Sequence, residues 1–132
     1  MARTASLFEA LTVLQRTAAR TLADALAEEG LTVDQWRVLR SLTDGEGHRP
    51  GELAAALVVP LASMTRLADG LADLGLVYRR PAEHDRRSVE LHLSRQGRLR
   101  LTRLDALVEA HQRELLADPA WETLRSLAPV ID

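Results

Sequence analysis

The hydrophobic period changes within one segment of this 132-residue chain, residues 50–97, and this change constrains the fold more than any other feature. Two short stretches with the 3.6-residue period of an amphipathic helix come first, separated by Val58, Val59 and Pro60. Pro50 suits the first turn of the first helix, because its missing N–H would have no partner there. The apolar positions are Leu53, Ala54 and Leu57, then Met64, Leu67, Leu71 and Leu74. We therefore expect two short helices joined by a tight turn.

A glycine and a hairpin pattern follow the second helix. Gly75 can adopt the left-handed conformation that closes a helix. Residues 76–80 lead into a polar turn with Pro81 and Asp85, after which residues 88–93 alternate between polar and apolar side chains. Alternation with a period of two is typical of a half-buried strand. Helix, turn, helix and hairpin together predict a winged helix-turn-helix, a fold that favours DNA binding.

Charge is unevenly distributed along the chain. The formal net charge is −2 and the hydrophobic content is 46%, which is typical of a folded globular domain. Residues 79–103 carry eight arginines and three acidic residues, a local balance of +5, so the remaining residues sum to −7. A basic face on an acidic body raises encounter rates with phosphate. The alternative interpretation is a solvated charge run without a partner.

Several functional classes have no support in the sequence. The chain has no cysteine, which excludes disulfides, thiolate metal sites and cysteine-based redox sensing. We find no apolar run of the ~20 residues that span a membrane and no signal-peptide pattern, and we expect a cytoplasmic protein. The four histidines form no recognisable ligand pair, and no catalytic fingerprint occurs. We expect no metal, no cofactor and no enzymatic activity.

Helices are predicted on both sides of the central segment. Residues 5–29 show a continuous apolar stripe, which either packs in the core or packs against a partner helix. Thr32 and Gln35 fit a capping box at the start of a helix that carries Trp36. Ser94 should cap a last long helix, followed by a short helix from Trp121 to Val130. The apolar positions of the long helix are Leu99, Leu101, Leu104, Leu107, Val108, Leu115 and Leu116.

The central segment resembles the MarR family of bacterial winged helix-turn-helix transcription regulators. The resemblance is close over residues 31–104 and depends on an ordered set of short matches. These are Leu31-Thr32 with Gln35-Trp36 and Leu39; Leu53-Ala54 with Leu57; Thr65-Arg66-Leu67; Leu71 with Gly75-Leu76-Val77; Arg79-Arg80; Asp85 with Arg87-Ser88; and Leu93-Ser94 with Gly97. The combination at these spacings is specific, although each piece alone is weak.

The resemblance implies an architecture and a function. We expect one domain, residues 1–132, mainly α with a small β-hairpin wing: a winged helix core over residues 31–97 and dimerisation helices at residues 5–29 and 98–131. The implied function is sequence-specific transcription regulation, as a repressor, by a homodimer on an inverted-repeat operator in double-stranded DNA. Release by a small aromatic or apolar effector is a further expectation. The alternative is a winged helix that binds other proteins and has lost specific DNA readout.

The same resemblance implies the site residues. Ser63, Thr65 and Arg66 would contact DNA from the recognition helix, where an arginine can bind a guanine edge or a phosphate. Pro60 and Ala62 depart from the family pattern, which commonly has polar residues at both positions.

The wing residues Asp85, Arg86 and Arg87 would complete the DNA-binding set. We expect Asp85 to hold Arg87 by a charged hydrogen bond, so that the guanidinium can enter the minor groove. A surface ion pair without function is the alternative. Trp36 is expected in the core, with an effector pocket as the second interpretation.

Overall fold

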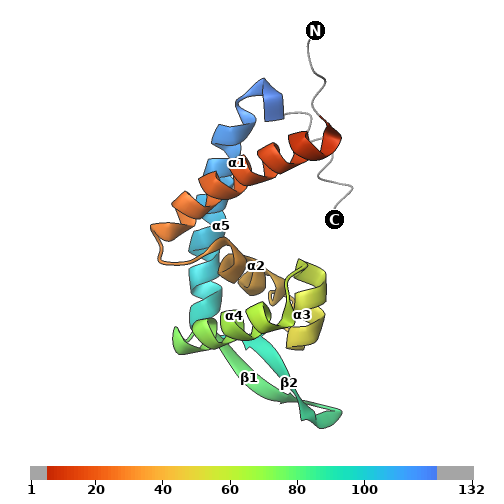
Figure 1. Ribbon diagram of the computed structural model, residues 1–132. Helices are drawn as coiled ribbons and strands as arrows, with labels where there is room; N and C mark the ends of the chain where they lie inside the picture. Colours follow the sequence, from red (N-terminus) through yellow and green to blue (C-terminus); the bar gives the residue numbers. More distant parts are fainter. Residues whose placement is uncertain (1–5, 122–132) are drawn as a thin grey trace. The chain divides into compact units, whose positions relative to one another are not determined.

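The computed structural model describes residues 6–121, which form five α-helices, one antiparallel hairpin and a short 3-10 helix (Figure 1). In chain order the elements are α1 (Leu7–Ala27), α2 (Val33–Ser41), α3 (Pro50–Leu57), α4 (Leu61–Asp73), β1 (Val77–Ala82), β2 (Asp85–Leu93), α5 (Arg95–Leu116) and η1 (Pro119–Trp121). They divide into two compact units. One unit is residues 31–104; the other combines residues 1–30 with 105–132, of which 6–30 and 105–121 are described.

The predicted helix boundaries are confirmed by their hydrogen bonds. Thr32 Oγ1 accepts from the Gln35 amide at 3.1 Å, while Gln35 Oε1 accepts from the Thr32 amide at 2.9 Å, which is the expected capping box. Pro50 begins α3, and Gly75 follows α4 with φ +74°. Ser94 Oγ accepts from the Gly97 amide at 2.9 Å and so caps α5. Each of these signals acts within four residues, which makes it readable from sequence.

The buried residues of α4 differ in part from the predicted helix face. Met64 and Leu71 of α4 are buried as expected, but Ala68 is buried with them, whereas Leu74 is 52% exposed. Leu74 is the C-cap residue, so it lies beyond the turn that faces the core. The fully buried large side chains of the 31–104 unit are Val38, Leu39, Leu42, Met64, Leu71, Leu91 and Leu104. Leu99, an apolar position of α5, is 64% exposed.

The hairpin is longer than predicted. Val77 pairs with Leu93 and Pro81 still pairs with Val89, so only Glu83 and His84 lie between the strands. The predicted polar turn, which began at Pro81, is therefore wrong: pairing continues through Pro81 and Ala82, where the sequence shows no alternating pattern. A register shift between Pro81 and Ala82 accompanies the closure of the hairpin.

Two long-range contacts join the elements of this unit. The backbone of His48 pairs with that of Leu91, with N···O distances of 3.1 and 2.8 Å, which adds a short bridge beside β2. Arg37 Nη2 donates to the Leu57 carbonyl at 2.6 Å, satisfying one of the last carbonyls of α3. These contacts fix α2 and the loop before α3 around the helix-turn-helix.

The second unit contains α1, the C-terminal part of α5 and η1 (Figure 1). The apolar stripe of α1 is buried only at its C-terminal end, at Ala25 and Leu26, whereas Leu7 is 70% and Phe8 79% exposed. The predicted short helix from Trp121 to Val130 lies outside the described residues, apart from Trp121, where η1 ends. Among residues 6–121 no single helix is long and apolar enough to cross a membrane; only α3 and α4 together, across a 114° bend, would be.

Candidate nucleic-acid interface

Helix α4 presents a polar stripe opposite its buried face. Thr65 and Arg66 are exposed, and Ser63 is half-buried. The Thr65 hydroxyl donates to the Leu61 carbonyl at 3.1 Å, one turn earlier, so its hydrogen is not available to a base. Arg66 forms no ion pair within residues 6–121, and its guanidinium is therefore available to an external anion.

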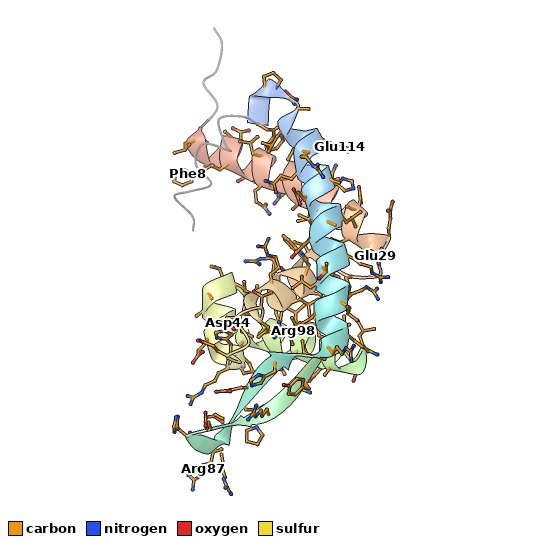
Figure 2. All side chains as sticks on the ribbon, turned by 180° about the vertical axis from the view of Figure 1, so that it is seen from behind. Phe8, Glu29, Asp44, Arg87, Arg98 and Glu114 are labelled. Carbon is orange, nitrogen blue, oxygen red and sulfur yellow. The ribbon has the colours of Figure 1, made fainter. Side chains whose placement is uncertain are left out.

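The tip of the β1–β2 hairpin carries the other cations. Arg86 and Arg87 are both exposed at the start of β2. Figure 2 shows Arg87 at the far end of the hairpin, with its side chain directed away from the strands. A guanidinium in that position can contact a nucleic acid without moving the hairpin.

Asp85 organises the wing, although not by the predicted contact with the Arg87 side chain. Its Oδ1 accepts from the backbone amide of Arg87 at 3.1 Å, and its Oδ2 accepts from Ser88 Oγ at 3.0 Å. This is the Asx-type bonding by which aspartate stabilises a turn. The carboxylate therefore binds the backbone of Arg87 and not its guanidinium, so it orders the turn and does not fix the direction of the Arg87 side chain.

A salt bridge that the sequence did not reveal connects the wing to the recognition helix. Arg79 Nη2 of β1 forms a hydrogen bond and ion pair with Asp69 Oδ1 of α4. Both side chains are well exposed, so the pair adds little stability, but it connects the two elements that carry the candidate DNA contacts. No local sequence signal predicts this pair, because Asp69 lies on a helix and Arg79 on a strand, and hydrophobic periodicity does not show how the two elements pack together.

The arrangement suits double-stranded DNA. A recognition helix enters the major groove, and an arginine on a projecting hairpin can enter an adjacent minor groove with strong negative potential. Arg66 and the wing arginines lie in the same compact unit, and their elements are joined by the Arg79–Asp69 pair.

Trp36, the candidate effector residue, is half-buried rather than fully in the core. The Arg40 guanidinium lies 5.4 Å from the centroid of its ring, within range of a cation–π contact. A cleft of about 610 Å³ lies elsewhere in the 31–104 unit, lined by Leu74, Leu76, Gln96, Leu99, Arg100, Thr102 and Arg103. The structure therefore does not bring Trp36 into this cleft.

The fold and site define a winged helix-turn-helix protein with further helices on both sides of the winged helix segment. The family model described as MarR family matches residues 29–88. The winged helix segment, residues 29–88, therefore has the sequence pattern of the MarR family, and solved MarR structures share the fold of almost the whole chain.

Named relatives match this chain over 77 and 116 residues. A stretch of 77 residues, 57% of this chain and 46% of the relative, is 39% identical to the HTH-type transcriptional repressor YetL of Bacillus subtilis. Over 116 residues, 86% of this chain and 57% of the relative, it is 33% identical to the transcriptional activatory protein BadR of Rhodopseudomonas palustris. The chain spans about half the length of these two relatives.

Solved structures match over almost the whole chain. Apo MarR from Escherichia coli superposes with a TM-score of 0.85 at 26% identity, covering 98% of both chains. The repressor CouR bound to a 23-mer DNA duplex gives 0.83 at 28% identity, covering 96% of this chain and 92% of CouR. The Mycobacterium tuberculosis MarR family protein Rv2887 in complex with salicylic acid gives 0.78 at 26% identity, covering both chains fully.

Proposed function

We propose that this protein is a sequence-specific transcription regulator that binds double-stranded DNA as a homodimer and represses the genes it controls. The observation that carries the proposal is the combination of a free, exposed Arg66 on α4 with Arg86 and Arg87 on a wing in the same unit. The similarity to a DNA-bound repressor supports it. Repression rests on the likeness to a named repressor. Because such a regulator works on the chromosome, we place it in the cytoplasm and assign it no catalysis.

A gel-shift assay against fragments of its own upstream region tests this function. The native chain should shift one fragment in preference to a scrambled duplex of equal length. Arg66→Ala should weaken specific binding by ~1–3 kcal/mol and relax preference at one position per half-site. Arg113→Ala is the matched control, because this arginine is also exposed but lies in the other unit. Equal binding of all fragments by native and Arg66→Ala chains would favour the alternative, a winged helix that binds proteins.

The homodimer is proposed from the uncovered stripe of α1. Leu7, Phe8, Leu11 and Val13 are 48–79% exposed, and Figure 2 shows Phe8 projecting from the helix. Contiguous apolar surface of this kind marks an interaction site. Sedimentation at micromolar concentration should show twice the 14.6 kDa chain mass, and Phe8→Glu should shift the equilibrium toward monomer. Val89→Glu, at an exposed valine of the wing in the 31–104 unit, should not. A native monomer would refute the arrangement.

The proposed operator is an inverted repeat. A twofold dimer places its two recognition helices about one turn of duplex apart, roughly 34–36 Å or a multiple of it. Footprinting should therefore protect two symmetric half-sites with this spacing. Protection of one half-site alone would contradict the proposal.

The effector is proposed to be a small aromatic or apolar molecule that lowers DNA affinity. A MarR family structure of the same length has been solved with salicylic acid. The chain has two tryptophans, so a Trp121→Phe variant isolates the fluorescence of Trp36. Titration with salicylate should change this fluorescence and release the bound duplex over the same concentration range. Release without a fluorescence change would remove Trp36 from the effector site.

A further inference from the structure

The first turn of α4 exposes apolar side chains where a recognition helix needs to contact bases. Leu61 and Ala62 are the first two residues of the helix, and both are exposed; Leu61 is 58% exposed. Pro60, the N-cap residue, forms no side-chain hydrogen bond to the helix. Leu61 and Ala62 contribute little to the core, so packing of the core does not require apolar side chains at these two positions.

Leu61 and Ala62 lie next to the polar residues of the site on the surface of α4. Ala62 lies one turn before Arg66, and Leu61 lies one turn before Thr65, so each pair shares a face of the helix. The buried residues Met64, Ala68 and Leu71 lie opposite Ala62 and Arg66, whereas Leu61 lies at the edge of the buried face, two turns before Ala68. The face around Arg66 therefore begins with apolar carbon.

Hydrogen-bond readout is limited at this end of the helix. The Thr65 hydroxyl already donates to the Leu61 carbonyl, and Ser63 is half-buried. The N-terminal residues of a recognition helix are the ones that contact base edges. In the major groove, the feature that an apolar side chain can recognise is the 5-methyl group of thymine.

We propose that Leu61 and Ala62 are specificity-determining residues that read thymine 5-methyl groups beside the base contacted by Arg66. This inference rests on the proposed DNA-binding function. It assigns each half-site one or two A·T pairs whose thymine methyl packs against α4. Recognition by these residues excludes water from apolar carbon on both partners, and so needs no polar group on the protein.

The expected effect is that of one methyl group. Burial of a single methyl group changes affinity about fourfold, the equivalent of ~0.8 kcal/mol. Replacing the contacted thymine with deoxyuridine removes this methyl and retains base pairing. Affinity should therefore fall about fourfold for each contacted thymine and stay unchanged at the others.

The experiment begins with selection of a duplex from a random pool by the full chain. Each thymine of the selected duplex is then replaced with deoxyuridine, one position at a time, and the dissociation constants of the native, Leu61→Ala and Ala62→Gly chains are measured. Each variant should abolish the deoxyuridine penalty at its own position. Leu99→Ala, which removes an equally exposed leucine from α5, should retain every penalty. Thermal unfolding of each variant checks that the fold is intact.

Each outcome has one meaning. Failure to enrich any duplex overturns the proposed function and this inference with it. A selected duplex that binds equally well with thymine or deoxyuridine everywhere overturns only the methyl contact. A penalty that persists in both α4 variants reflects the DNA itself or another residue, and overturns the assignment to Leu61 and Ala62. Loss of the penalty in the α4 variants alone establishes it.

Discussion

Substitutions at Asp85 and Arg87 separate the charge of the wing from its geometry. Arg87 is exposed at the tip, and the Asp85 carboxylate accepts hydrogen bonds from the Arg87 amide and the Ser88 hydroxyl. Arg87→Ala removes the cation and keeps the turn. Asp85→Ala removes both hydrogen bonds and one negative charge. Asp85→Asn removes the charge and keeps an oxygen that can accept from the Arg87 amide.

The magnitudes follow from these contacts. Loss of one phosphate contact lowers the salt slope of log affinity by ~0.9 per protomer, and by ~1.8 for a dimer, so Arg87→Ala should do this on any sequence. Asp85→Ala removes two hydrogen bonds, each of which stabilises the ordered turn by ~0.5–1.5 kcal/mol. It also removes a carboxylate within a Debye length of ~8–10 Å of bound phosphate, which favours binding. We expect the loss of order to dominate. Asp85→Ala should therefore lower affinity less than Arg87→Ala does and leave the salt slope unchanged. Asp85→Asn should bind more tightly than the native chain at low salt.

Fluorescence anisotropy titrations between about 50 and 200 mM salt, on cognate and scrambled A·T-rich duplexes, measure these effects. Arg113→Ala is the control for loss of an exposed arginine outside the 31–104 unit. If Arg87→Ala left both affinity and slope unchanged, the wing would not contact DNA, and the protein-binding alternative would gain support. If Asp85→Ala and Asp85→Asn bound equally well, the hydrogen bonds of Asp85 would have no role.

Three further predictions concern the scaffold. Val58, at φ 57° and 88% exposed, costs ~1–2 kcal/mol in the left-handed region, so Val58→Gly should raise Tm by several degrees. A Cβ on Gly97 would lie 2.0 Å from the Leu76 carbonyl oxygen, so Gly97→Ala should lower the free energy of unfolding by ~1–3 kcal/mol in denaturant titrations. The pKa of Asp44 is lowered by the Glu46 amide hydrogen bond and a nearby histidine. The stability that Asp44 contributes is fully present above its unfolded pKa of 3.8 and is lost as pH falls through the lower folded value, so the deficit of Asp44→Asn in denaturant titrations should shrink as pH falls below 3.8.

Local signals in the sequence determined the order and ends of the helices. The Thr32–Gln35 capping box, Pro50, Gly75 and Ser94 all act through contacts within four residues, and all lie where the sequence predicts. The residue types of the site were readable for the same reason, since Arg66, Arg86 and Arg87 fall on polar faces of predicted elements. Their contact with DNA stays a prediction.

Only the tertiary structure decided the contacts between elements. The hydrogen bond from Arg37 to Leu57 spans 20 residues, and the Arg79–Asp69 pair joins a strand to a helix. Periodicity assigns a residue to one face of its own element and carries no information about the element packed against it. For that reason Leu74 has the spacing of a core residue and yet is exposed. It is the C-cap residue of α4, beyond the last turn that packs against the core, and packing geometry sets where that turn lies.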